Sequence, residues 1–307
     1  MKMRYEKAQA FLTGLVASSP ELPFEPTLLP DLFASTADNS MKPTQHIAEL
    51  VERSQGLATR ILRLANSAYY GMQTAVSSLS HAIRLLGLNE VRNIILQIGV
   101  SSMLNKMAFP KGFPFEELWE HHILTANLAR TIARCLPPNA FGQDNSLGPD
   151  EIYAAGLLHD MGKTLLASQC AEDWLAIQDL ATCDNIPFYK AEEDYWGLDH
   201  SVVGARMLTF WGLPPGLTEL VGWHHAPLQA KGAHITPTRI LAAANLLAHQ
   251  PPAALFPEQK DGAALVLPAE IAAILPETLD RAKLAAGIKA CSDTDKVRSM
   301  AAAAMGR

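Results

Sequence analysis

Apolar residues recur at three- and four-residue intervals along most of this sequence. Residues 46–70, HIAELVERSQGLATRILRLANSAYY, show the spacing of an amphipathic helix, and the same period returns throughout the chain. Residues 77–104 are interpreted as two such helices, broken near Gly87, with Asn89 as the N-cap of the second helix ahead of Glu90. Because the pattern lacks the strict alternation of a strand, it predicts an all-α fold.

Clusters of proline and glycine separate the helical segments. Loops or boundaries are expected at residues 108–115, 136–150, 212–216 and 250–268. The sequence therefore predicts an N-terminal helical region at 1–110, a central helical core at 111–250 and an Ala-rich C-terminal helical tail at 251–307. The simple composition of the tail allows it either to pack as a helix or to fray.

Composition limits the class of protein. The chain has 307 residues, of which 49% are apolar, so it can bury a sizeable core. Only 18% of the residues are charged and the net charge is −6, so we expect no direct binding to nucleic acid or to a membrane surface. No apolar run approaches the roughly 20 residues that span a bilayer. The N-terminal apolar stretch is too short for a signal peptide, and we expect a cytoplasmic protein.

The cysteines have no CxxC spacing, which predicts reduced, mostly buried thiols at Cys135, Cys170, Cys183 and Cys291.

Metal-competent side chains are concentrated in the central region. Imidazole nitrogens combined with carboxylate oxygens suit zinc, manganese, nickel or iron, and a bridging aspartate can hold two ions that acidify a bound water. One or two divalent ions are therefore expected, with no organic cofactor. The candidate side chains are His121, His122, His159, Asp160, His200, His224 and His225.

The segment YAAGLLHDMGK, residues 153–163, places His159 and Asp160 at the end of a strongly apolar helix. A buried carboxylate costs several kcal/mol unless it is paired or bound to metal, so Asp160 requires a partner. Two interpretations are open at this point. Either Asp160 is a metal ligand, or it caps the next turn near Gly162 while His159 is hydrogen-bonded in the core.

Other histidines are weaker candidates. His46, His81, His234 and His249 have no second ligand at usable spacing, and we expect structural or exposed roles for them. The pair His224 and His225 gains weight because His200 precedes it by one helix and one turn. Gly204 in HSVVG allows a close approach between helices there.

Several motifs resemble known families. HDMGK resembles the His-Asp dyad of HD-superfamily phosphohydrolases. ILRLANSAYYG, VSSLSHAIRLLGLNEVRNIIL, LWEHHILTANLAR, EEDYWGLDHSVVGARMLTFWGLP and the closing HH resemble the HDOD family, the HD-related output domain of bacterial signalling proteins, over about residues 15–250. This resemblance implies an all-α fold in which an HD-domain-like helical bundle carries an additional N-terminal helical subregion. It also implies a role in signalling pathways, commonly without demonstrated catalysis.

The resemblance also implies roles for individual residues. His121 is the first ligand, with His122 as the adjacent alternative, and His159 and Asp160 form the central dyad. Lys163 matches the lysine that the HD-GYP branch keeps for substrate phosphate. Three further metal ligands resemble the additional histidines of that branch: His200, His224 and His225.

Two departures from these patterns weigh against catalysis. Asn245 lies where an HD hydrolase carries its last aspartate ligand, and an amide is a poorer partner for a divalent cation. The HHE and GYP elements of the cyclic di-GMP hydrolases are absent after His225, so that activity is not expected.

Two main hypotheses follow. The first is a regulatory module without an appended receiver, which contacts other signalling proteins and retains a metal site. The alternative is a metal-dependent phosphohydrolase acting on a nucleotide or phosphoester, with Asp160 and Lys163 as catalytic residues. A third interpretation, in which the histidines sense pH or oxidant, has no specific support in the sequence.

Overall fold

In the computed structural model every regular element is a helix, within the residues that it describes. These are residues 6, 8–14, 27–36, 47, 49, 51, 56–67, 70–141, 147–256, 265–291 and 293–305. The predicted all-α fold is thereby confirmed. Of the residues considered in the sequence, His46 and parts of the loops at 136–150 and 250–268 lie outside the described residues.

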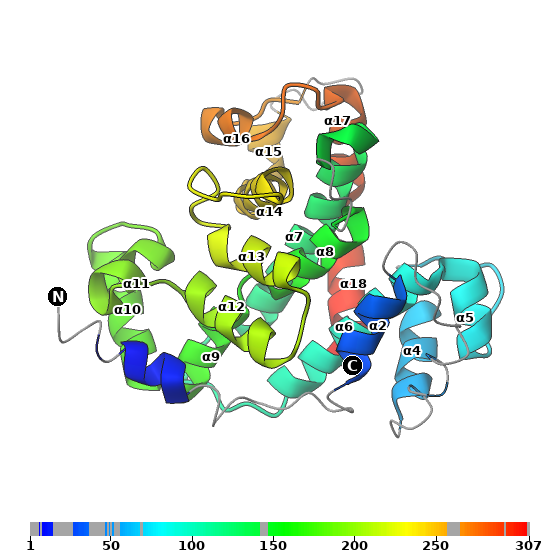
Figure 1. The fold of residues 1–307 in the computed structure, drawn as a ribbon, viewed down its shortest axis with the longest axis horizontal. Coiled ribbons are helices and arrows are strands. Elements are labelled where there is room, and N and C mark those ends of the chain that lie inside the picture. The colour runs from blue at the N-terminus through cyan, green and yellow to red at the C-terminus, as the bar shows by residue number, and fades with distance from the viewer. Residues whose placement is uncertain are drawn as a thin grey trace.

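The N-terminal region packs on one side of a long buried helix, α6 (Leu88–Leu104). It contains α2 (Leu28–Thr36), α4 (Leu57–Ala65) and α5 (Leu79–Leu86). Residues 91–104 of α6 are all buried, because this helix packs against α2, α4 and α5 on one side and against the central region on the other (Figure 1).

Gly87 separates α5 from α6, as the sequence predicts. Its φ of 87° lies in the left-handed region that favours glycine. The predicted N-cap is wrong, because Gly87 itself precedes the first turn and Asn89 lies inside the helix. The Asn89 side chain instead donates a hydrogen bond to Asp150, with 3.3 Å between Nδ2 and Oδ2.

The central region is a bundle of short helices. Its elements are α7 (Phe115–Arg134), η1 (Pro138–Phe141), α8 (Pro149–Leu158), α9 (Met161–Gln169), α10 (Ala171–Cys183), α11 (Phe188–Trp196), α12 (His200–Phe210), α13 (Pro215–Trp223) and α14 (Ile235–Ala248). Helix α7 packs on α8 and α14, while α12 packs on α9 and α13. The approach of α7 and α8 depends on Gly156, where a Cβ would lie 2.6 Å from the Cα of Ala126.

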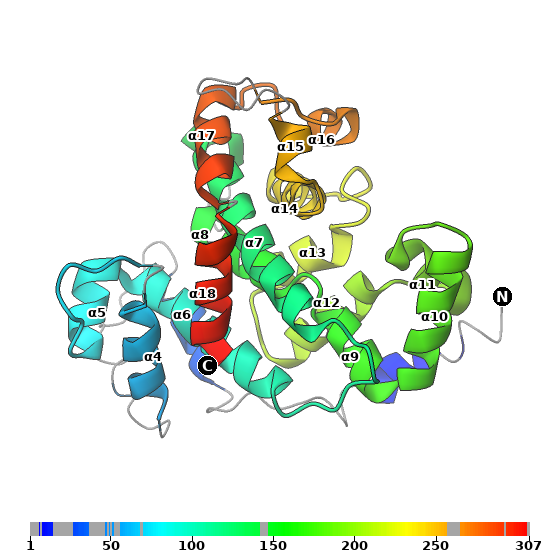
Figure 2. The same cartoon turned by 180° about the vertical axis from the view of Figure 1, so that it is seen from behind.

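The C-terminal tail packs rather than frays over its described residues. It forms α15 (Pro252–Leu255), α16 (Ala269–Ile274), α17 (Arg281–Cys291) and α18 (Thr294–Met305). Figure 2 shows α18 running along α7 towards α6. The carbonyl oxygen of Ala304 accepts hydrogen bonds from Ser101 Oγ at 2.7 Å and Arg60 Nη2 at 2.9 Å. The tail therefore joins the N-terminal region to the central one, and the three-part division by sequence stays a prediction.

The structure also bears on membrane spans and on the cysteines. No helix in the described part of the chain is both long and apolar enough to cross a membrane. All four cysteines are free of disulfides, but only Cys135 is buried, so the expectation of mostly buried thiols is wrong. Cys183 lies exposed at the end of α10, where no packing partner covers it.

Candidate metal centre

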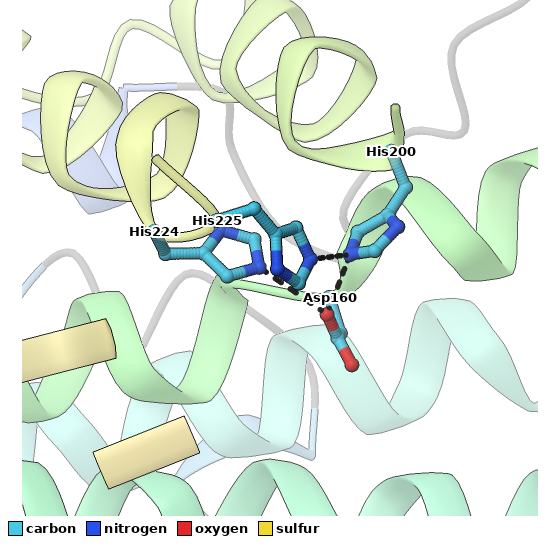
Figure 3. A group of neighbouring side chains, drawn as sticks. All are labelled: Asp160, His200, His224 and His225. Atoms are coloured by element: carbon cyan, nitrogen blue, oxygen red, sulfur yellow. Dashed lines mark hydrogen bonds and ion pairs between the residues drawn. The ribbon is translucent and has the colours of Figure 1, made fainter. Parts of the chain in front are cut away.

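The candidate ligands come from α7 and from the ends of other helices that meet in the central region. His121 comes from the middle of α7, and Asp160 lies with His159 in the turn between α8 and α9. His200 begins α12, and the pair His224 and His225 follows the end of α13. Figure 3 shows the rings of His200, His224 and His225 gathered around the Asp160 carboxylate. Side chains far apart in the sequence thus share one pocket, as predicted.

Asp160 is the centre of this pocket and is fully buried. Three imidazole Nε2 atoms surround its Oδ1: that of His200 at 2.9 Å, that of His159 at 3.3 Å and that of His224 at 3.7 Å. A carboxylate that belongs to the same metal site as several histidines has to lie close to their ring nitrogens in this way.

The second carboxylate oxygen faces two other groups. Lys163 Nζ lies 2.6 Å from Asp160 Oδ2, and His121 Nε2 lies 3.7 Å from it. His121 Nε2 is also 3.2 Å from His159 Nε2. All six predicted metal ligands and Lys163 are therefore within one constellation, although their roles as ligands stay a prediction.

The alternative role of Asp160 as a cap is wrong. Asp160 does occupy the N-cap position of α9, but its side chain accepts no capping hydrogen bond from the backbone. Gly162 serves packing instead: a Cβ there would overlap the His200 carbonyl oxygen and lie 3.0 Å from the Gly204 nitrogen. The predicted close approach at Gly204 is confirmed, and it brings the start of α12 onto the HD turn.

Backbone carbonyls orient three of the rings. A carbonyl oxygen can only accept, so the facing Nδ1 must carry the proton and Nε2 is left with a lone pair directed into the pocket. Metal-bound histidines are commonly held in this way. The pairs are His122 with Leu157 at 2.6 Å, His159 with Gly156 at 2.8 Å and His224 with Val221 at 2.7 Å.

Two residues on α11 contact the rings of His200 and His225, and the sequence reasoning missed both. Glu192 Oε2 lies 2.5 Å from His200 Nδ1 and accepts a hydrogen bond from the His200 backbone N–H at 2.9 Å. The ring of Tyr189 stacks on that of His225, with centroids 4.1 Å apart and 10° between the planes. Their spacing of three residues on one helix was the only available signal.

Burial and neighbouring charges set the protonation of the pocket. Burial raises the pKa of Asp160, but His159 and Lys163 outweigh it and hold that pKa well below its ordinary value. Burial lowers the pKa of His159 to about 4. Burial also lowers the pKa of His200, but the carboxylates of Glu192 and Asp160 outweigh it and raise that pKa to about 9. The pocket thus presents an ionised carboxylate and a neutral His159 in the state that binds metal, whereas His200 is protonated at neutral pH and must release its Nε2 proton to bind an ion.

Buried atoms without partners support a fit between these residues and a metal ion. Within the described part of the chain, Asp160 Oδ1 and His224 Nε2 are buried and have no hydrogen-bond partner of acceptable geometry. Each buried atom of this kind costs about 1–3 kcal/mol if nothing meets it. Nitrogen donors with one carboxylate suit iron, manganese, nickel or zinc.

The ligand atoms fall into two groups that share Asp160. One group combines Asp160 with His121 and His159, and the other combines it with His200, His224 and His225. Within each group all ligand atoms lie within 4.8 Å of one another. His122 belongs to neither group, so the geometry favours His121, the first choice by sequence, over its neighbour.

The histidines set aside by sequence have different surroundings. His81 accepts a hydrogen bond from the Ser77 backbone N–H at 3.3 Å, and His234 pairs with Glu219 at 2.8 Å, which agrees with structural roles. His249 is exposed at the end of α14, but its ring stacks on His121 with centroids 4.5 Å apart. Its place beside a candidate ligand was not visible in the sequence spacing.

A cleft of about 830 Å³ opens beside His224 and His225. Its lining includes Asn245, which is 5% exposed and whose Oδ1 has no hydrogen-bond partner. Large apolar side chains are exposed around the cleft, with Leu228 at 65% and Trp223 at 39%. The candidate centre therefore adjoins a surface that can hold another molecule.

Comparisons with known proteins agree with this architecture. The family model of the HDOD domain matches residues 22–227. An uncharacterized protein from Treponema pallidum (strain Nichols) is 25% identical over 179 residues, or 58% of this chain, and the chain spans 33% of that relative's length. A proposed phosphohydrolase from Shewanella amazonensis SB2B has a similar fold, with a TM-score of 0.71 at 20% identity over 96% of this chain and 98% of that one. A proposed signal transduction protein from Marinobacter aquaeolei VT8 also has a TM-score of 0.71, at 22% identity over 94% of this chain and 61% of that one.

Proposed function

This chain belongs to the HDOD family, and from that premise we propose that it is a regulatory module that holds a divalent metal and acts through contacts with signalling proteins. One observation carries the metal part of the proposal. Buried imidazoles converge on a single buried carboxylate, with their Nε2 atoms turned inward by hydrogen bonds on the opposite ring nitrogen.

The metal site would use the two groups that share Asp160. His121 and His159 would hold an ion on one side, and His200, His224 and His225 would hold an ion on the other. A bound metal supplies positive charge and Lewis acidity in a pocket from which water is largely excluded. The chain's own contribution is to keep the Asp160 carboxylate ionised and to fix the orientation of the rings.

Two features favour regulation over turnover. Asn245 is a neutral amide where the HD resemblance calls for a last carboxylate, which weakens the hold on a hard cation. In addition, exposed apolar side chains lie around the cleft, including Trp223 and Leu228, and such patches are typical of protein interfaces. A structural relative whose name proposes signal transduction supports the same role.

A phosphohydrolase is the second candidate, and Lys163 favours it. Its ammonium group lies 2.6 Å from Asp160 Oδ2 while 15% of its side chain stays exposed. A lysine in this position can neutralise the charge of a phosphate beside the ligands. The structural relative whose name proposes a phosphohydrolase supports this candidate.

Metal content and turnover separate the two candidates. Protein purified without chelator is expected to contain iron, manganese, nickel or zinc, measured by elemental mass spectrometry, and not to hydrolyse bis(p-nitrophenyl) phosphate. His159→Ala is expected to lose most of that metal, because His159 Nε2 lies 3.3 Å from Asp160 Oδ1. Turnover that disappears in His159→Ala would instead establish the phosphohydrolase, and wild-type protein without metal would refute the metal site.

The partner surface can be tested with a matched pair of variants. Leu228→Asp places a charge on the cleft, whereas Leu175→Asp places one on α10, where the wild-type leucine is 43% exposed. Affinity capture from extracts of the source cells is expected to recover the same partner proteins with wild type and Leu175→Asp, and at least tenfold less of them with Leu228→Asp. Equal recovery by all three proteins would place the partner surface elsewhere.

A further inference from the structure

Glu192 is a carboxylate that is 1% exposed and that no candidate metal group includes. Its Oε2 meets both the backbone N–H and the Nδ1 of His200, whereas its Oε1 has no hydrogen-bond partner. Burying a carboxylate costs several kcal/mol unless strong partners compensate. Both partners of this one belong to a single residue, a candidate metal ligand.

His200 differs in this respect from the other oriented rings. The Nδ1 atoms of His122, His159 and His224 face neutral backbone carbonyls, but that of His200 faces a charged oxygen at 2.5 Å. A carboxylate on Nδ1 withdraws the proton more strongly than a carbonyl does, and it makes Nε2 a more basic ligand. His200 Nε2 is also the imidazole nitrogen nearest to Asp160, at 2.9 Å.

A tight turn between α11 and α12 brings Glu192 and His200 together. Glu192 lies on α11 and His200 begins α12, and the connection between them contains Gly197 in the left-handed region, with φ of 84°. That turn brings the carboxylate back onto the first N–H of α12. The same bond therefore orients the ring and satisfies an N-terminal N–H that α12 itself leaves without a partner.

We propose that Glu192 is a positioning residue for the metal centre, which fixes the His200 ring and strengthens its Nε2 as a ligand through a charged hydrogen bond on Nδ1. This inference rests on the proposed metal site and adds to it a residue that touches no metal. Glu192 acts through His200, because neither of its carboxylate oxygens has another hydrogen-bond partner among the residues that the structure describes.

The test compares Glu192→Gln with Glu193→Gln, in the full chain and with the metal ion alone as ligand. Glu193 is the next residue on α11, and its carboxylate pairs with Lys190 on the surface. We expect Glu192→Gln to bind Mn²⁺ and Zn²⁺ about 10–100-fold more weakly in chelator competition, as is usual when the partner of a ligating histidine is lost. The affinity of Glu193→Gln should stay within about twofold of wild type.

Three further measurements separate positioning from a general structural role. In the presence of chelator, Glu192→Gln should unfold at a lower temperature than wild type, because His200 loses its buried charged partner, but its circular dichroism spectrum at the temperature of the binding assay should match that of wild type. In a His200→Ala background, changing Glu192 should have no further effect on metal affinity. The Co²⁺ absorption spectrum of Glu192→Gln should also differ from wild type, whereas that of Glu193→Gln should not.

The outcomes distinguish this inference from the proposed function. Wild-type protein that binds no metal would overturn both. Wild-type protein that binds metal, with Glu192→Gln equal to Glu193→Gln, would overturn only the role of Glu192. A loss of affinity that persists undiminished in the His200→Ala background would do the same. If Glu192→Gln does not fold, Glu192→Asp carries the comparison, since it keeps the charge but draws it back from Nδ1 and should weaken metal binding in a protein that still folds.

Discussion

Asp160→Asn is expected to abolish metal binding. Asp160 is the only residue shared by both groups of candidate ligands, and three imidazole Nε2 atoms lie within 3.7 Å of its Oδ1. Loss of a partner that merely orients a ligand costs about 10–100-fold in affinity, so loss of the shared carboxylate should cost more than about 100-fold. Elemental analysis of the purified variant and titration with Mn²⁺ or Zn²⁺ measure this directly.

Asp173→Asn is the matched control. Asp173 is also a buried aspartate, 6% exposed, but its Oδ1 accepts a hydrogen bond from Tyr195 Oη at 3.1 Å, and it belongs to neither ligand group. Its metal content should equal that of wild type. If both Asp160→Asn and Asp173→Asn kept their metal, the ion would be bound elsewhere and the proposed site at Asp160 would be wrong.

Gly162→Ala is expected to destabilise the protein strongly. The added Cβ would overlap the His200 carbonyl oxygen and lie 2.8 Å from its carbon, and backbone atoms cannot rotate away as a side chain can. Overpacking of a core costs about 1–3 kcal/mol and sometimes more, and this contact between two backbones belongs at the upper end. A loss of about 3 kcal/mol corresponds to a fall in Tm of about 6–12 °C, measurable by calorimetry.

Gly222→Ala provides the comparison. Gly222 lies on α13 beside the same pocket, but the nearest atom to its added Cβ would be Ala205 Cβ at 3.4 Å, an ordinary contact. Its Tm should remain within about 3 °C of wild type, because the single contact needs little adjustment. A Gly162→Ala protein as stable as Gly222→Ala would show that the crossing of α9 and α12 has room to open.

Much of the fold could be predicted because helical periodicity is local. The break at Gly87 follows from glycine alone, and the helices on either side of it follow from apolar spacing within single segments. The N-cap was assigned wrongly because Asn89 has a partner from another helix, Asp150, which local rules do not include. The same limit explains why the packing of α18 on α6 and α7 could not be chosen over fraying.

For the candidate centre, the sequence by itself predicted which side chains come together. The order of histidines predicted a shared site, and the resemblance to HD phosphohydrolases implied that His121, His159, Asp160 and His200 are companions in it. The same information left the role of Asp160 open between ligand and cap.

Only the tertiary structure excluded the capping role, and only it revealed Glu192 and Tyr189. Whether Asp160 caps a helix or faces imidazoles depends on where α12 and α13 cross the HD turn, and that crossing depends on backbone contact at Gly162. The direction of each Nε2 depends on what meets Nδ1 across the pocket, a carbonyl or the carboxylate of Glu192. Such contacts join residues from different helices, and they cannot be predicted from a pattern that repeats every 3.6 residues within one helix.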